Sequence, residues 1–582
     1  MTRLTGSAIA LVAAVSAVSA APAITAPKFY RDDPLVRVID TQDAVKAAER
    51  DISLYYDALI NLFGRPGEQT VGRAESVNTI DEVPDSSWFT NRAGVRPVTP
   101  DDMLRGVNDD TGPAPGKWLV SRKAGGASAG FTIEDERGKT YFVKFDPPGR
   151  PELGSASEAI VTRLFHALGY HVPQASITML RREQLVAGPD ASVRLPSGRR
   201  RQMRPSDIDE VLKQAHQNPD GSYRAVAAEG LPGKPLGGFK YEGTRPEDPN
   251  DVIRHENRRE LRGLRVFSAW VNHTDAKALN SLDTLISENG RSIVRHHLID
   301  FNAALGSAGI GLRARRDGYE YLAEVGPSTR ALPAFGFRTR DWMTIDYPEF
   351  RGVGRFESTR FVPEEWRPRV PNPAYVRSRP DDTFWAARKL MALSDDAIRA
   401  AVKVGRLTDS RAEQFLAQAL IERRNKIGGA WLTKVNPVVD PALAEDGTLT
   451  FRNAAVQYGF ALAPSRYLTV WHRFDNETGE AQRIGESESV GEKVSAPAGA
   501  LTRTKPESTR PGGGMFIRVD ISAPGAPQAS WSSPVHAYFR HTADGWKLVG
   551  FDRLPDAPLM RPGLVGAQPL DAAERERKAG SR

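Results

Sequence analysis

The stretch of residues 257–302 constrains the fold most, because a helix, a polar loop and a hairpin follow one another there. Apolar residues at helical spacing predict a helix from about Asn257 to Val271. Two runs with strand character follow, Leu282–Ser287 and Ser292–Ile299, and Asn289-Gly290 between them is a strong hairpin signal. The polar loop therefore follows a helix and precedes a two-stranded hairpin.

That loop reads H-T-D-A-K-A-L-N over residues 273–280, and each polar residue has a chemical interpretation. Asp275, at the mouth of a tight loop, could accept a proton from a hydroxyl nucleophile. Lys277 lies near enough to neutralise charge on a transferring phosphoryl group. Asn280, and Asp300 at the end of the hairpin, offer the oxygens that Mg²⁺ prefers. Phosphoryl transfer needs little beyond alignment, charge neutralisation and a metal.

These motifs make the chain similar to the protein-kinase-like superfamily. That family's catalytic loop reads H-R-D-x-K-x-x-N, and its metal motif D-F-G follows a short hairpin. This chain has H-T-D-A-K-A-L-N and then D-F-N. The resemblance covers about residues 117–430. It implies that Asp275 is the catalytic base, that Lys277 contacts phosphate, and that Asn280 and Asp300 bind Mg²⁺.

The region before the loop supplies the rest of the pattern in the same order. Strands are expected at residues 118–120, 131–133 and 141–145, with a turn at residues 137–139. The resemblance implies that Lys144, on the third strand, binds the α and β phosphates of ATP, and that Glu158 on the next helix is its ion-pair partner. Small residues between the first two strands would let backbone N–H groups approach phosphate; they include Gly125, Gly126 and Gly130.

Each feature also has a simpler interpretation. Glu158 stands three residues after Ser155, so the pair would complete a capping box for a helix that Gly169 ends. Lys144 on a strand is typical of a solvated edge. The glycine-rich loop is also compatible with an ordinary hairpin, and Asp275 with a surface turn. The shared order of all these features favours the kinase-like interpretation.

Three departures point away from the common eukaryotic form. The interval from Lys144 to Glu158 is short, Asn302 replaces the glycine of D-F-G, and no A-P-E sequence follows. The chain is therefore more similar to atypical branches, which include HipA-type, phosphoinositide-kinase-like and secretory-pathway kinases.

The first twenty residues indicate export. Arg3 is their only charge, an apolar run extends from Ala8 to about Ala20, and Val18-Ser19-Ala20 supplies the small residues that signal peptidase needs. The run is too short to span a bilayer, and a buried N-terminal helix is the alternative. We expect a periplasmic or secreted protein cleaved near Ala20, with no transmembrane segment.

The absence of cysteine in all 582 residues excludes disulfides, zinc–thiolate sites and thiol catalysis.

The length of the chain and its predicted helices and strands indicate an α+β protein with several domains. We expect a signal peptide at 1–20, an N-terminal extension at 21–116, a two-lobed protein-kinase-like domain at 117–432, a C-terminal β-rich module at 433–570 and a disordered tail at 571–582. Helices are expected from Thr41 to Phe63, after Ser394, and after Ser410 with Glu413 as a capping box. Strands are expected at Tyr467–Phe474, Met515–Ile521 and Val535–Phe551, the last folding at Asp544-Gly545.

Together these features predict a Mg²⁺-dependent phosphotransferase that moves the γ-phosphoryl group of ATP to a hydroxyl of a protein, glycan or lipid head group. The alternative is a catalytically inactive kinase-like exported protein that binds or scaffolds a partner. The ligand set favours the first, and the scarcity of ATP in the periplasm favours the second. The net charge of +7, from 79 basic and 72 acidic residues, does not indicate a nucleic-acid partner.

Overall fold

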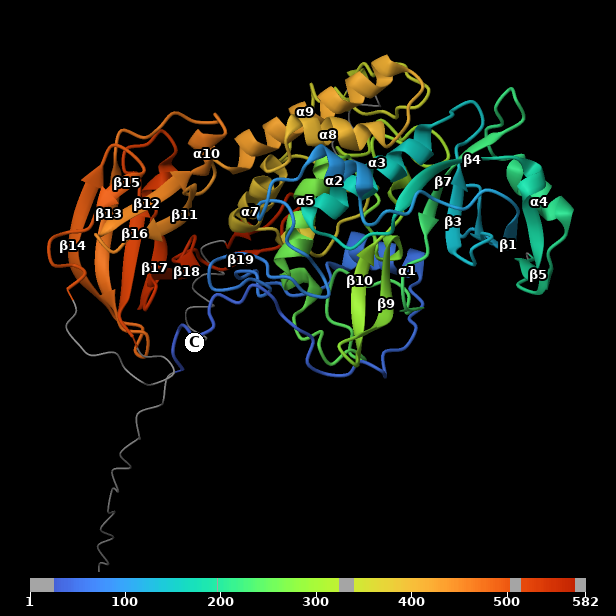
Figure 1. Cartoon of the computed structure of the whole chain (residues 1–582). Coiled ribbons are helices and arrows are strands. Elements are labelled where there is room, and N and C mark those ends of the chain that lie inside the picture. The colour runs from blue at the N-terminus through green and yellow to red at the C-terminus, as the bar shows by residue number, and fades with distance from the viewer. Residues whose placement is uncertain (1–25, 196, 324–339, 503–513, 571–582) are drawn as a thin grey trace, which may run out of the picture.

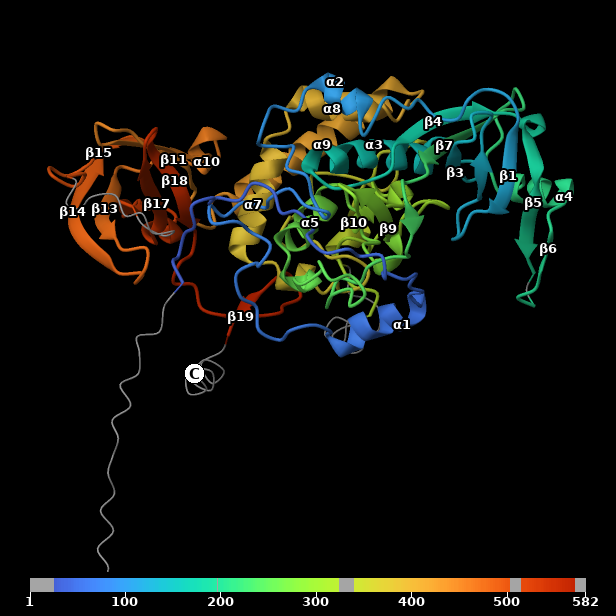
Figure 2. The ribbon, with the colours of Figure 1, turned by 60° about the horizontal axis from the view of Figure 1, so that its bottom comes forward.

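The computed structural model describes residues 26–195, 197–323, 340–502 and 514–570. The expected signal peptide and disordered tail lie outside these ranges. Figures 1 and 2 show a β-rich module at one end, a sheet-containing lobe at the other and a mainly helical lobe between them. This arrangement is α+β, as expected, with two lobes between an N-terminal extension and a β-rich module. Within the described ranges, no helix combines the length and apolar character needed to cross a bilayer.

The first lobe is a seven-stranded sheet in the order β4-β7-β3-β2-β1-β5-β6, with helix α3 packed against it. Its elements are β1 (Trp118–Lys123), β2 (Gly130–Glu134), β3 (Thr140–Phe145), α3 (Leu153–Leu168), β4 (Ala175–Leu180), η2 (Arg182–Gln184), β5 (Leu185–Arg194), β6 (Arg200–Gln202), α4 (Pro205–Leu212) and β7 (Tyr223–Glu229). The three strands expected here are confirmed as β1, β2 and β3. Tyr141, Val143 and Phe145 alternate along β3 and are buried, as one apolar face of a strand requires.

The second lobe is mainly helical. Its elements are β8 (Lys234–Pro235), η3 (His255–Asn257), α5 (Arg259–Trp270), η4 (Ala278–Asn280), β9 (Ser281–Glu288), β10 (Arg291–Leu298), η5 (Phe301–Ala303), η6 (Asp341–Thr344), η7 (Tyr375–Arg377), α7 (Pro380–Met391), α8 (Asp395–Lys403) and α9 (Ser410–Trp431). The predicted helix before the polar loop is confirmed as α5, and the hairpin as β9 and β10. Trp270 and Trp385 are fully buried where these helices meet.

The β-rich module has a three-stranded and a five-stranded sheet. Its elements are β11 (Val438–Leu443), β12 (Thr448–Asn453), α10 (Ala454–Gln457), β13 (Tyr467–Phe474), β14 (Ala481–Ser489), β15 (Lys493–Ser495), β16 (Phe516–Ser522), η8 (Ala529–Ser532), β17 (Val535–Thr542) and β18 (Gly545–Asp552), followed by β19 (Met560–Arg561) and β20 (Gln568–Pro569). The expected strands are confirmed as β13, β16 and the β17–β18 hairpin.

The N-terminal extension contains α1 (Leu54–Leu59), the π-helical turn η1 (Ile60–Gly64) and α2 (Pro100–Arg105). The helix expected from Thr41 is wrong over its first half. Ala44 and Ala47 instead pack beside the β9–β10 hairpin, and the N–H of Ala44 donates to the carbonyl of Ser292 at 2.8 Å. Tertiary packing therefore overrides the helical spacing of these residues.

Two helix starts differ from the expected capping residues. Helix α3 begins at Leu153, so Ser155 lies inside it and does not cap it. Helix α9 begins at Ser410 itself, and Asp409 is the cap, accepting from the N–H of Arg411. The cap of α8 by Ser394 is confirmed, since its hydroxyl accepts from the N–H of Ala397 at 3.1 Å.

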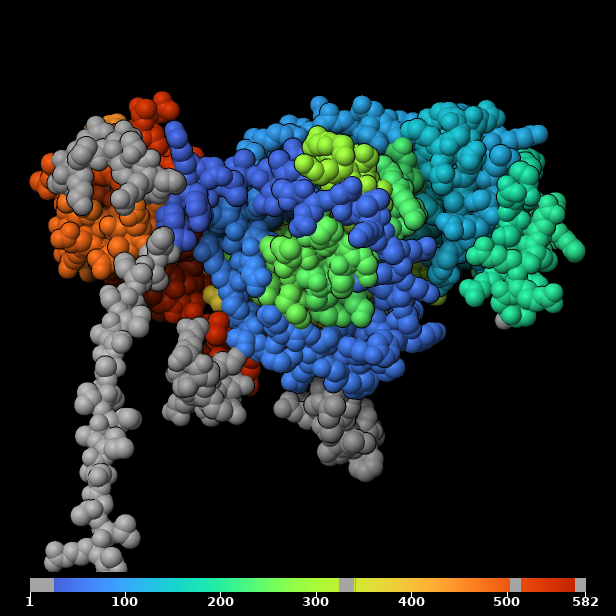
Figure 3. Space-filling model, turned by 90° about the horizontal axis from the view of Figure 1, so that it is seen from below, coloured from blue at the N-terminus to red at the C-terminus, as the bar shows by residue number. Residues whose placement is uncertain are grey.

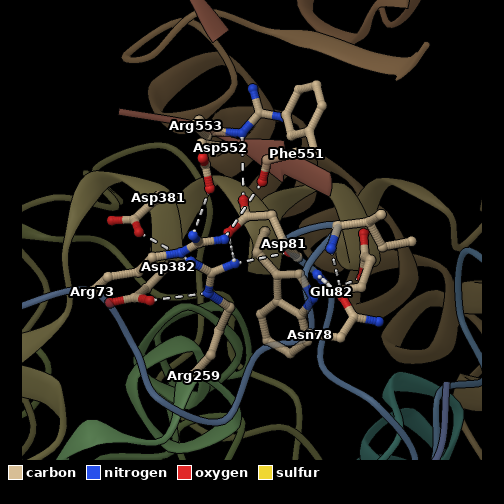
Figure 4. A network of polar contacts seen from close by, with 12 residues as sticks. Arg73, Asn78, Asp81, Glu82, Arg259, Asp381, Asp382, Phe551, Asp552 and Arg553 are labelled. Atoms are coloured by element: carbon tan, nitrogen blue, oxygen red, sulfur yellow. Dashed lines mark hydrogen bonds and ion pairs between the residues drawn. The ribbon is translucent and has the colours of Figure 1, made fainter. Parts of the chain in front are cut away.

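A buried ion network joins the extension, the helical lobe and the β-rich module (Figure 4). The guanidinium of Arg259 on α5 donates to Asp81 at 2.7 Å, Asp381 at 3.0 Å and Asp382 at 3.1 Å, and its side chain is 0% exposed. Arg73 bridges Asp81 and Asp552 of β18, at 2.9 Å to each carboxylate. Segments distant in sequence thus depend on one another's charges.

We expect Arg259→Met to lower the free energy of unfolding by about 3–5 kcal/mol, because the buried carboxylates around it would lose the cation that they share. Urea denaturation followed by circular dichroism measures this loss. The control is Arg466→Met, which breaks an exposed pair with Glu488, and we expect it to cost less than about 1 kcal/mol. Equal losses in the two variants would contradict the prediction.

Glu82 should contribute to acid sensitivity. Burial acts to raise its pKa, but Lys389 and Arg388 outweigh burial and lower the pKa from 4.5 to about 2. A carboxyl whose pKa falls on folding stabilises the protein above its unfolded pKa and loses that effect as the pH drops through the folded value. We expect Glu82→Gln to flatten the fall in stability between about pH 4.5 and pH 2. The exposed Asp396→Asn should leave the slope unchanged in the same acid titration.

Candidate active site

A lysine and two carboxylates from three separate elements meet between the lobes. The ammonium of Lys144 on β3 lies 2.7 Å from Oδ1 of Asp300 and 3.8 Å from Oε2 of Glu158 on α3. The Lys144 and Glu158 side chains are 19% and 3% exposed, whereas that of Asp300 is 39% exposed. The cluster is therefore closed on the helix side and open at Asp300.

The backbone after β10 is shaped to hold Asp300. Asp300 has φ of 65°, a left-handed conformation that is uncommon for a residue with a side chain and is concentrated at functional sites. The N–H of Asn302 donates to Oε2 of Glu158 at 2.7 Å, and the hydroxyl of Ser157 donates to the carbonyl of Phe301 at 2.9 Å. Helix α3 is thus bonded to the segment that carries Asp300.

The start of α3 is held by Asp146, a residue that the sequence analysis did not single out. Its buried carboxylate accepts from the N–H groups of Glu152, Gly154 and Ser155 at 2.8–2.9 Å, and from the Ser155 hydroxyl at 2.6 Å. A carboxylate satisfying the first N–H groups of a helix is a strong cap. Glu158 is therefore free of the capping role that its spacing from Ser155 suggested, and it faces Lys144.

The polar loop forms a second group of contacts. The ammonium of Lys277 lies 2.8 Å from Oδ2 of Asp275. The side-chain amide of Asn280 donates to the Asp275 carbonyl at 2.8 Å and to its Oδ2 at 3.3 Å. The amide oxygen of Asn280 is the atom that this arrangement leaves for a further ligand.

The two groups lie side by side. The N–H of Ile299, the residue before Asp300, donates to the carbonyl of Asn280 at 3.0 Å. Burial lowers the pKa of Arg313, whereas the nearby charges of Asp275 and Asp300 both act to raise it. The structure therefore brings Lys144, Glu158, Asp275, Lys277, Asn280 and Asp300 to one region between the lobes.

Charge states follow from the surroundings. Burial acts to lower the pKa of Lys144, but Glu158 and Asp300 outweigh it and raise the pKa, so the amine stays protonated at neutral pH. Burial acts to raise the pKa of Asp275, but Lys277 outweighs it and lowers the pKa, so this group is a carboxylate. Asp275 is therefore a charged acceptor that Lys277 and Asn280 hydrogen-bond.

The three predicted glycines occupy different positions. Gly125 and Gly126 lie in the loop between β1 and β2, and a Cβ on either would meet nothing within 4 Å. Gly130 is instead the first residue of β2 and pairs with Lys144. A Cβ there would lie 2.3 Å from the Val143 carbonyl oxygen, so only glycine fits beside Lys144. The loop also approaches the Asp300 segment, since Ser128 accepts from the Asn302 amide at 3.0 Å.

The oxygen donors fit a hard divalent cation. Asn280 and Asp300 supply one amide and one carboxylate oxygen, and Mg²⁺ commonly takes few protein ligands and completes its shell with water and phosphate. Lys144 lies between the two carboxyl groups, and burial raises the pKa of Glu158, whereas Asp300 is on the open side. Among the described residues there is no cluster of three or more His, Asp or Glu side chains that could hold a metal alone.

Comparisons with known proteins give weak similarities only. No protein-family model and no curated protein matches the sequence. A solved structure of the Golgi casein kinase with Mn/ADP bound is 9% identical, with a TM-score of 0.27, over 54% of this chain and 73% of that chain. A second Golgi casein kinase structure is 9% identical, with a TM-score of 0.28, over 68% of this chain and 94% of that one. Similarities this weak carry no inference about this protein's activity.

We expect Asp146→Ala to destabilise the protein by about 2 kcal/mol or more, because several buried donors at the start of α3 would lose their acceptor. The matched control is Ser394→Ala at the start of α8, where one cap bond is lost and about 1 kcal/mol is expected. Thermal and urea denaturation of both variants check this. A smaller effect at Asp146 than at Ser394 would contradict the assigned cap.

Proposed function

We propose that this protein is a phosphotransferase that uses ATP and a divalent cation to phosphorylate a hydroxyl group. The observation that carries the proposal is the meeting of Lys144, Glu158 and Asp300 beside the loop of Asp275. A fixed ammonium, acidic and amide oxygens and a separate carboxylate are the groups that phosphoryl transfer requires. Mg²⁺, when bound, would neutralise charge on the phosphate oxygens.

The residues divide into two roles. Lys144, held by Glu158, would bind the α and β phosphates of ATP, while Asp300 and Asn280 would hold the cation. Gly125 and Gly126 leave the backbone of the β1–β2 loop open to phosphate, because no neighbouring atom lies within 4 Å of where a Cβ would be.

The other role concerns the acceptor. The Asp275 carboxylate would take the hydroxyl proton as the oxygen attacks the γ-phosphorus, and the bond from that phosphorus to the β–γ bridging oxygen breaks. Lys277, 2.8 Å from Asp275, is placed to stabilise the phosphoryl oxygens once it turns from the carboxylate. The acceptor class, whether protein, glycan or lipid head group, is set by surfaces beyond these residues.

We expect ATP with Mg²⁺ to raise the Tm of the protein, because a ligand that binds only the folded state stabilises it. Asp300→Asn should remove most of that shift, since the cation loses its carboxylate. Asp275→Asn should keep the shift, and it should reduce transfer of radiolabelled phosphate to water or a generic acceptor by about 100-fold or more, as loss of a general base does.

The control for both variants is Asp396→Asn, an exposed carboxylate on α8. It should behave as the unmodified protein. Absence of any nucleotide-dependent shift with Mg²⁺ or Mn²⁺ would overturn the proposal and leave a kinase-shaped exported binding protein as the surviving hypothesis.

A further inference from the structure

One cavity lies away from the candidate active site. It has a volume of about 400 Å³, which is within the range of small-molecule sites. Its walls come from the N-terminal extension at residues 37–40 and 85–92, the C-terminal end of α3 and the β9–β10 hairpin. Figure 3 shows this hairpin at the surface beside the extension. His166 in the wall lies eight residues beyond Glu158 on α3, which corresponds to about 12 Å along the helix.

Arginine side chains dominate the charged lining. Four guanidinium groups face three carboxylates; the arginines are Arg37, Arg92, Arg291 and Arg295, and the carboxylates are Asp40, Asp85 and Glu288. Glu288 is shared by Arg37 at 3.1 Å and Arg295 at 2.8 Å, and Nε of Arg295 is buried without a hydrogen-bond partner. One carboxylate of the hairpin therefore pairs with two cations, one from the extension and one from the hairpin.

Arg92 lacks a matching anion. Its Nη1 donates to the carbonyl oxygens of His166 at 2.8 Å and Tyr170 at 3.4 Å. Burial lowers its pKa to about 10, although the charge of Asp85 acts in the opposite direction. Among the described residues, no carboxylate oxygen lies within 4.0 Å of the Arg92 guanidinium. Arg37 and Arg96, in contrast, each have a carboxylate partner within that distance. A mostly buried cation that carbonyl dipoles alone satisfy favours an anionic ligand.

The remaining polar groups suit hydroxyl groups on that ligand. Ser86, Ser87 and Thr90 line the cavity with Asp40 and Asp85 on the extension side. His166 adds no positive charge, because burial lowers its pKa to about 3. The lining therefore combines arginines from both the extension and the hairpin with hydroxyl and carboxylate acceptors.

From this arrangement we propose that the cavity binds a small hydroxylated anion, whose phosphate or carboxylate group contacts the arginines while its hydroxyl groups contact the serine, threonine and aspartate side chains. The inference does not rest on the proposed phosphotransfer, since none of the candidate active-site residues lines this cavity. The bound molecule would link the N-terminal extension to α3, the helix that carries Glu158.

Isothermal titration calorimetry of the full mature chain tests the proposal. The probes are glycerol 3-phosphate and gluconate, which separate phosphate from carboxylate recognition, with glycerol as the uncharged control. We expect at least one anion to bind with a dissociation constant below about 1 mM, and glycerol not to bind. Arg92→Gln and Arg291→Gln should each weaken binding by about 10-fold or more, as expected for loss of a charge-assisted contact.

Three further variants make the result decisive. Val107→Trp fills the cavity without removing a charge and should abolish binding even if Arg92→Gln does not fold. Arg483→Gln, an exposed residue on β14, should not change binding. Asp300→Asn should also leave binding unchanged, which separates this site from the nucleotide site. The proposal is overturned if neither anion binds, or if binding persists in both Arg291→Gln and Val107→Trp.

Discussion

The shared ammonium group of Lys144 is the interaction on which the site depends. One cation on β3 faces carboxylates from α3 and from the segment after β10, at 3.8 Å and 2.7 Å. Both carboxylates would repel each other and burial would penalise Glu158 strongly if the lysine were absent. The ammonium of Lys144 therefore joins the two lobes through ion pairs, and Asp300 remains on the open side of the cluster.

Much of this arrangement could be predicted from the sequence because it is encoded locally. The hairpin of β9 and β10 follows from Asn289-Gly290, and β3 follows from alternation around Lys144. The order of Lys144, Glu158, Asp275 and Asp300 predicted one shared site, and the structure places these residues together. Their roles in catalysis remain a proposal that geometry supports.

The parts that could not be predicted depend on contacts between distant segments. Asp146 caps α3 across an intervening turn, so no spacing rule relates it to the helix. Ala44 has the spacing of a helical residue but bonds to the β9–β10 hairpin instead. The partners of Arg259 come from the extension and from α7, and only the folded chain brings them within 3.1 Å.

The register of strand β3 links the ion pair of Lys144, which was predicted, to the helix cap by Asp146, which was not. Lys144 and Asp146 stand two residues apart, so they project from the same side of the chain if it remains extended beyond β3. Asp146 fixes where α3 begins, and the beginning of α3 fixes which side Glu158 presents to Lys144. A shift of β3 by one residue would turn Lys144 into the apolar core of the sheet and withdraw the cap from α3. Gly130 opposes such a shift, because its neighbour Val143 leaves no room there for a side chain. The ion pair, the helix cap and the glycine are thus consequences of one pairing between β2 and β3.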